Sequence, residues 1–110
     1  MHEVKIKPLS VNAAWQGRRF KSKAYEAYEK ELSYLLPKMR VSKGSLRLWI
    51  IFGIQKMQDI DSGLKQFIDV CQKKYEFNDR DIMGMIVEKR IVKKGEEYIQ
   101  FEISPCRNCY

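Results

Sequence analysis

One apolar run, "SLRLWIIFGIQ", limits the folds open to this 110-residue chain more strongly than any other segment. Successive side chains of a β-strand point to opposite faces. One face of this run carries only large apolar residues, namely Leu46, Leu48, Ile50, Phe52 and Ile54. Trp49 and Ile51 point the other way, so we expect both faces to be partly covered. The run therefore predicts a strand in the centre of a sheet.

Helical patterns flank this strand on both sides. Apolar residues recur every three or four positions before it, at Tyr25, Tyr28, Leu32, Leu35 and Leu36, and after it, at Leu64, Phe67, Ile68 and Cys71. Ser22 is a suitable N-cap for the first helix, and Pro37 should end it. Asp61 or Ser62 is the natural N-cap of the second.

Three further segments have the composition of strands: "EVKIKP", "DIMGMIVEKRIV" and "YIQFEIS". The last two flank "KKGEE", which suggests a hairpin turn. No repeat or linker interrupts the chain. We therefore expect one α+β domain over residues 1–110, in β-α-β-α-β-β order, with a mixed sheet and helices packed on it.

The chain is strongly basic, with 21 Lys and Arg against 14 Asp and Glu and a net charge of +7. Such an excess suits a polyanionic partner such as nucleic acid, and equally a surface kept soluble by charge. No apolar run approaches the roughly 20 residues that span a membrane. With no apolar signal segment, we expect a cytoplasmic protein with reduced thiols.

The three cysteines are Cys71, Cys106 and Cys109. Cys71 falls on the apolar face of the second helix and is most simply a small core residue. The other two form a C-x-x-C pair, but a zinc site usually needs four ligands. An incidental reduced pair is the simpler interpretation.

Two carboxylates stand just ahead of the second helix, in "QDIDSGLKQF". If that segment is extended, Asp59 and Asp61 point to one side. Lys65 lies one helical turn after Asp61, and Asp79 precedes the next strand. Mg²⁺ is usually held by one or two carboxylates together with substrate phosphate oxygens. The alternative is that Asp61 caps its helix, that Lys65 pairs weakly with it, and that Asp59 is a loop residue.

The segment "DIDSGLKQFIDVCQKKYEFNDRDI" resembles the core signature of the RusA family of Holliday junction resolvases. That signature runs D-L-D-N-x-x-K-x-x-x-D-x-L, followed by an acidic pair and an apolar residue that opens a strand. The matching positions are Asp59, Asp61, Lys65, Asp69 and, in place of the acidic pair, Asn78 and Asp79. "KPLSVNAAWQGRRFKS" is similar to the Pro-Ser-x-Asn stretch and basic loop that open family members, so the resemblance covers nearly the whole chain.

The resemblance implies a Mg²⁺-dependent endodeoxyribonuclease that nicks two strands of a four-way junction, leaving 5′-phosphate and 3′-hydroxyl ends. Asp59, Asp61 and Asp79 would be catalytic and hold the metal, with Mn²⁺ able to substitute. Lys65 would be the active-site lysine. Asn78 replaces the first acid of the usual pair, and Asp81 stands where the family more often has a neutral polar residue, so Asp81 is an alternative third ligand to Asp79.

Paired nicks need two active sites, and the resemblance implies a homodimer. The small size of the chain would suit a bacteriophage or prophage protein. The expected DNA contacts are Asn12, Trp15, Arg18, Arg19, Lys21 and Lys23, with phosphate contacts added by Lys38, Arg40, Lys73 and Lys74. Trp15 could equally pack in the core. The competing hypothesis is a non-catalytic module that binds nucleic acid through basic and aromatic residues.

Overall fold

The computed structural model describes residues 1–16 and 20–106, apart from the side chains at positions 11, 12, 15, 16 and 20. The elements in chain order are β1 (His2–Val4), α1 (Val11–Ala14), β2 (Trp15–Gln16), β3 (Phe20–Lys21), α2 (Lys23–Leu35), β4 (Leu46–Ile54), α3 (Leu64–Tyr75), the 3-10 helix η1 (Asp79–Asp81), β5 (Ile82–Ile91) and β6 (Tyr98–Pro105). The main elements form one α+β domain in the predicted order.

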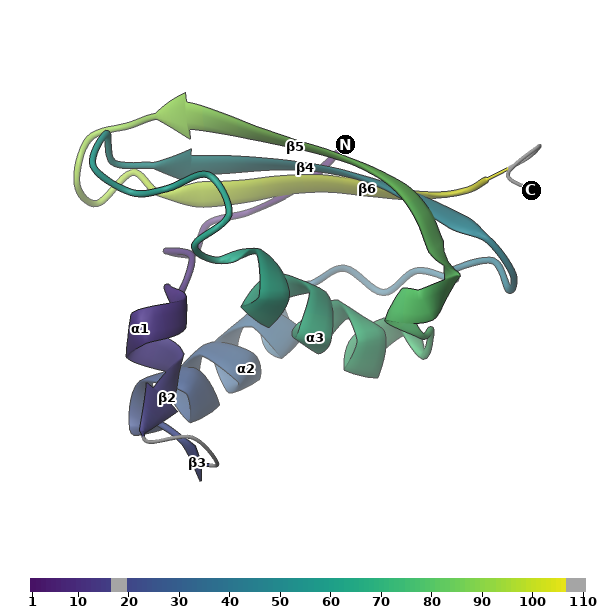
Figure 1. Cartoon of the computed structure of the whole chain (residues 1–110), viewed down its shortest axis with the longest axis horizontal. Coiled ribbons are helices and arrows are strands. Elements are labelled where there is room, and N and C mark those ends of the chain that lie inside the picture. The colour runs from purple at the N-terminus through teal and green to yellow at the C-terminus, as the bar shows by residue number, and fades with distance from the viewer. Residues whose placement is uncertain (17–19, 107–110) are drawn as a thin grey trace.

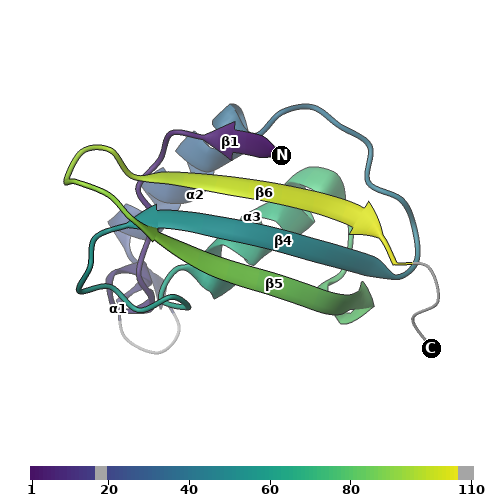
Figure 2. The same cartoon turned by 90° about the horizontal axis from the view of Figure 1, so that it is seen from above.

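The four main strands form a mixed sheet in the order β1-β6-β4-β5, with α2 and α3 on one of its faces (Figure 1). Figure 2 shows β4 between β5 and β6, which confirms the predicted central strand. β4 pairs parallel with β5 and antiparallel with β6. The predicted β5–β6 hairpin is therefore wrong: both strands pair with the apolar β4, and their connection passes the end of that strand.

The core lies between β4 and the helices. Leu48, Ile50 and Phe52 on the inner face of β4 are buried, as the alternating pattern predicted. The ring of Phe67 on α3 packs edge-on against Phe52 and against Phe101 on β6, with centroids 6.3 and 5.5 Å apart. Edge-to-face contacts of this kind stabilise beyond the apolar area that they bury. The sheet and α3 are therefore joined at the middle of β4.

Cys71 is buried on α3 as a free thiol, as expected of a small core residue. Burial raises the pKa of this thiol, so it stays protonated. Cys106 is instead disulfide-bonded, so the expectation of a reduced pair at the C-x-x-C was wrong for this residue. Among the described residues, no helix has the length and apolarity that a membrane-spanning segment needs.

Within the described residues, no helix covers the outer face of the sheet (Figure 1). Trp49 on this face is 40% exposed, and its Nε1 donates a hydrogen bond to Glu88 at 2.6 Å. Gly53, further along the same face of β4, lies directly beneath the ring of Tyr98. A β-carbon at this position would overlap the ring, which would then have to move aside. Ile51 on the same face is buried, so the prediction that both faces of β4 are partly covered is confirmed.

Ser22 caps α2 as predicted, because its Oγ accepts a hydrogen bond from the backbone N–H of Tyr25 at 3.1 Å. The prediction for α3 was wrong. This helix begins at Leu64, with Gly63 at the cap position and no side-chain cap. The backbone N–H groups of Ser62 and Leu64 bond instead to the carbonyls of Asp59 and Asp61, which closes turns before the helix.

The described residues between β1 and α2 contain more regular secondary structure than the basic loop that we expected. It contains α1 and a two-residue antiparallel pairing of β2 with β3. The hydroxyl of Ser22 donates to the carbonyl of Ala13 at 2.6 Å, and its backbone N–H donates to the carbonyl of Ala14 at 2.9 Å. These bonds fix the start of α2 beside the end of α1.

Candidate active site

The two aspartates that precede α3 lie in turns. We expected an extended segment, but β4 ends at Ile54 and a first turn is closed by the bond from Gln58 N–H to the carbonyl of Gln55. The second turn runs from Asp59 to Ser62. Asp, Ser and Gly are common in turns because they tolerate the backbone conformations that turns require. The alternation that would align the two carboxylates is therefore absent.

Lys89 on β5 supports this loop, although no residue pattern indicated that role. Its ammonium donates to the carbonyls of Lys56 (2.9 Å) and Gln58. Gln58 directly precedes Asp59, and Lys56 lies three residues before it. A lysine from the neighbouring strand thus helps to hold the chain that leads into the two aspartates.

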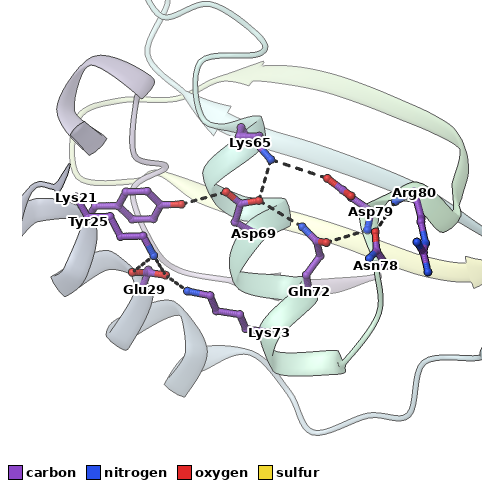
Figure 3. A network of polar contacts seen from close by, with 10 residues as sticks. All are labelled: Lys21, Tyr25, Glu29, Lys65, Asp69, Gln72, Lys73, Asn78, Asp79 and Arg80. Atoms are coloured by element: carbon purple, nitrogen blue, oxygen red, sulfur yellow. Dashed lines mark hydrogen bonds and ion pairs between the residues drawn. The ribbon is translucent and has the colours of Figure 1, made fainter. Parts of the chain in front are cut away.

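Lys65 in the first turn of α3 contacts carboxylates from two different segments (Figure 3). Its Nζ lies 3.1 Å from Asp69 Oδ1, one turn along the helix, and 3.9 Å from Asp79 Oδ2, just before β5. The Lys65 side chain is 68% exposed, and such surface ion pairs contribute at most about 1 kcal/mol each. These weak contacts orient the ammonium and leave it able to move to another anion.

Asp69 is the centre of this network. Besides Lys65, its carboxylate accepts hydrogen bonds from the Tyr25 hydroxyl on α2 at 3.3 Å and from the Gln72 amide at 3.3 Å. Burial, followed by the nearby charges of Asp69 and Glu29, raises the pKa of Tyr25, so its hydroxyl keeps its proton and donates. Asp69 is thus held from two helices while it contacts the lysine.

A reversal of the chain after α3 brings Asp79 to this network. Glu76 ends the helix in the left-handed conformation, with φ 56° and ψ 49°. The chain then doubles back, and the Asp79 N–H donates to the Gln72 side-chain oxygen at 2.8 Å. Asn78 stabilises the next turn by accepting from Arg80 N–H at 3.0 Å. Gln72 therefore bridges Asp69 and Asp79.

The two alternatives for a third ligand lie in different surroundings. Asp79 contacts Lys65, whereas Asp81 lines a small hollow together with Ser42 and Lys43. Contact with Lys65 favours Asp79. Asp59 and Asp61 are exposed, and their side chains have no hydrogen-bond or ion-pair partner within the described residues.

A second cluster lies beside the first. Glu29 on α2 accepts from Lys21 at 3.0 Å and from Lys73 on α3 at 2.9 Å, and the Lys21 ammonium lies 4.9 Å from the Tyr25 ring centroid (Figure 3). Burial disfavours the charge on Glu29, but the hydrogen bonds and charges of Lys73 and Lys21 outweigh it and lower the pKa. Lys21 and Lys73, both expected to contact DNA, are thus already paired with a carboxylate.

Only part of the expected DNA-contacting set can be placed. Arg18 and Arg19 lie outside the described residues, as do the side chains of Asn12 and Trp15. Lys23 is exposed at the start of α2. Tyr25, Gln72 and Lys89 belong to the site although sequence reasoning missed their polar roles. Tyr25 followed the apolar pattern of its helix, which hid the function of its hydroxyl.

The donor chemistry of the carboxylates fits Mg²⁺, which prefers oxygen ligands. Within residues 1–16 and 20–106, however, no three His, Cys, Asp or Glu side chains gather closely enough to hold a metal ion. The parallel pairing explains this: Asp59 follows the end of β4, whereas Asp79 precedes the start of β5. A bound ion would therefore be held by one or two of these carboxylates and by oxygens of the substrate.

No protein-family model matches this chain, and no curated protein matches it.

Proposed function

We propose that this protein is a Mg²⁺-dependent endodeoxyribonuclease that resolves Holliday junctions by paired nicks. The observation that carries the proposal is the contact of Lys65 with both Asp69 and Asp79. These residues come from the two halves of the motif that resembles the RusA signature. An active site built from that motif requires these residues to be in contact. A surface that only keeps the protein soluble does not require this contact.

The residues suit phosphodiester hydrolysis. Attack on an anionic phosphodiester meets charge repulsion, and negative charge grows in the transition state. Asp59 and Asp61 at one end of β4, or Asp79 at the other, would supply one or two oxygen ligands, and a Mg²⁺ held by them and by phosphate oxygens would offset that charge and lower the pKa of water. Lys65 is exposed and weakly paired, so its ammonium can leave Asp79 and contact the scissile phosphate.

A homodimer belongs to the proposal, because two nicks across a junction require two sites and one chain supplies one. Branched DNA is the proposed substrate, and the cytoplasmic location stays a prediction. The net charge of +7 supports a polyanionic partner, since the carboxylate site alone would repel DNA.

The test uses a labelled four-way junction and its linear duplex arms, each incubated with Mg²⁺ or with EDTA. The wild-type protein should nick the junction in pairs, only with Mg²⁺, and leave the linear arms intact. Asp61→Asn and Lys65→Ala should each remove cleavage while junction binding persists. Glu102→Gln, an exposed acid on the outer face of the sheet, is the matched control and should cleave normally. Cleavage by Asp61→Asn at the wild-type rate would overturn the proposal.

A second candidate is a non-catalytic nucleic-acid-binding module. The turns at Asp59–Ser62 favour it, because they explain these residues by local structure alone. Such a module would bind the junction without nicking it, and neither EDTA nor Asp61→Asn would change its affinity. Cleavage and binding measured in the same reactions therefore separate the two functions.

A further inference from the structure

A groove of about 850 Å³ runs between the 38–43 segment and the C-terminal end of α3. Four basic residues line it, namely Lys38, Arg40, Lys43 and Lys74. Among the described residues of its lining, Glu76 is the one acid. The groove thus presents four cations against a single carboxylate, which makes it an electropositive channel on the protein surface.

The four basic side chains in this groove are not held in ion pairs. None of the four cations has an ion-pair partner among the described residues, whereas Lys21, Lys65 and Lys73 each contact an acid. A cation without a carboxylate partner can bind a phosphate without first breaking an ion pair. This groove is therefore better prepared for a polyanion than the Lys21 region, where Glu29 already neutralises charge.

The walls of the groove are tied together. The Tyr75 hydroxyl at the end of α3 donates to the carbonyl of Pro37 at 2.7 Å, which joins the start of the 38–43 segment to the helix. Burial raises the pKa of Tyr75 to about 12, so this donor stays protonated near neutral pH. The groove is preformed to this extent, which lowers the entropy cost of binding a ligand in it.

The groove leads toward the candidate active site. A second hollow of about 370 Å³ shares Val41, Ser42, Lys43 and Glu76 with it. That hollow is also lined by Asn78 and Asp81, which flank Asp79 and Arg80 in the sequence. Its acids, Glu76 and Asp81, outnumber Lys43, so the phosphates would be held in the basic groove, and the strand beyond it would pass the turn that carries Asp79.

A hollow slightly larger than this groove has a different charge. It measures about 920 Å³ and lies between the start of α2 and the β5–β6 connection. Lys5 and Lys7 line it together with Glu31, Glu96 and Glu97, so acids and bases are mixed there. Size alone would have pointed to this hollow, but its charge gives a polyanion no preference for it.

We propose that the groove lined by Lys38, Arg40, Lys43 and Lys74 binds the sugar-phosphate backbone of one nucleic-acid strand and leads it to the carboxylates at Asp79. This inference rests on the proposed function, because it describes how the substrate of the proposed active site is held. The ligand is the backbone, so binding here does not depend on base sequence.

The decisive variant is the triple change Lys38→Gln, Arg40→Gln and Lys74→Gln. Its matched control is Lys7→Gln, Lys93→Gln and Lys94→Gln, which removes the same charge from exposed residues near the β5–β6 connection, at the end of the sheet opposite the groove (Figure 1). Binding of a fluorescent four-way junction is measured by anisotropy in EDTA over a series of salt concentrations. The groove variant should bind at least about tenfold more weakly, and its salt slope should fall by about 0.9 for each phosphate that it no longer binds. The control should change less than about twofold.

Equal losses in both triple variants, or no loss in the groove variant, would overturn the inference. The charge-conserving set Lys38→Arg, Arg40→Lys and Lys74→Arg should keep wild-type affinity, which separates removal of charge from misfolding. Acetylation of the wild-type protein gives an independent measurement. Bound DNA should protect Lys38, Lys43 and Lys74 but leave Lys93 and Lys94 reactive, and uniform reactivity would contradict the groove.

The two proposals fail separately. Groove-dependent binding without Mg²⁺-dependent nicks would leave the groove established and the nuclease refuted. Nicks that persist in the groove variant with undiminished junction affinity would leave the nuclease and refute the groove.

Discussion

The hydroxyl of Tyr25 on α2 lies 3.3 Å from the carboxylate of Asp69 on α3, 44 residues away in the sequence. Asp69 also contacts Lys65 and Gln72, so this bond connects the first helix of the layer to the candidate active site. The position of the lysine thus depends on how α2 and α3 pack against each other.

Tyr25→Phe should reduce the free energy of unfolding by about 0.5–1.5 kcal/mol, because it removes one hydrogen-bond donor from Asp69. The measurement is urea unfolding followed by circular dichroism.

Tyr28→Phe is its control. The Tyr28 hydroxyl is buried on the same helix and has no hydrogen-bond partner within the described part of the chain. Its removal relieves an unsatisfied buried group, so this variant should be as stable as the wild type or more stable. A greater destabilisation by Tyr28→Phe than by Tyr25→Phe would contradict the network in Figure 3.

Asp69→Asn should slow junction cleavage by about tenfold, the scale seen when a partner that orients a functional group is removed. Asparagine keeps the shape of the side chain but not its charge, so Lys65 would no longer have its nearest anion, at 3.1 Å. Single-turnover rates and junction affinity are measured together. We expect the rate to fall while affinity is kept, and a parallel fall of both would show that Asp69 serves DNA binding instead.

Glu29→Gln should destabilise the protein at neutral pH by about 1 kcal/mol, because it breaks the ion pairs with Lys21 and Lys73. The pKa of Glu29 is lower in the folded protein than its usual value of 4.5. Its stabilising effect is therefore complete above that value and is lost as the pH falls through the folded pKa. Urea unfolding at pH 7, 5 and 3 should show the wild type and variant converging toward pH 3. A difference that stays constant with pH would contradict this role.

Gly53→Ala should cost about 1–3 kcal/mol, because its β-carbon would overlap the Tyr98 ring and force the ring aside. Gly84→Ala on β5 is the matched control, since the nearest atom would be Nε of the flexible Arg47 side chain at 3.3 Å. Thermal unfolding of both variants checks the prediction. Equal melting temperatures would mean that the Tyr98 ring moves away at no cost.

The features that the sequence predicted well are local ones. Ser22 caps its helix through a bond to a residue three positions away. The inner face of β4 is buried as the alternation of its apolar residues predicted, because side chains two apart in a strand point to the same face. The order of β5 and β6 in the sheet is not local. Both strands compete for the edges of β4, and the turn-like "KKGEE" between them is compatible with a hairpin or with a longer connection.

The contacts of the candidate site also differ in how far apart the residues lie in the sequence. The spacing of Lys65 and Asp69 predicted their contact, since residues four apart share a face of a helix. The contact of Lys65 with Asp79 needs the left-handed turn at Glu76, a conformation that glutamate rarely adopts and that no residue pattern announced. The role of the Tyr25 hydroxyl could not be predicted, because the ring is buried like that of any core tyrosine. Its hydrogen bond to Asp69 depends on how α2 and α3 pack.

The pairing of β1 with β6 has a consequence for how the protein is made. His2 lies opposite Phe101, so the strand nearest the beginning of the sequence finds its partner only after about a hundred further residues have left the ribosome. Until then, β4 also lacks its neighbour β6 and exposes an apolar edge. Folding should therefore be completed late and slowly, as is typical of sheets built from distant segments, and nascent chains that stop before β6 should be targets for chaperones and proteases.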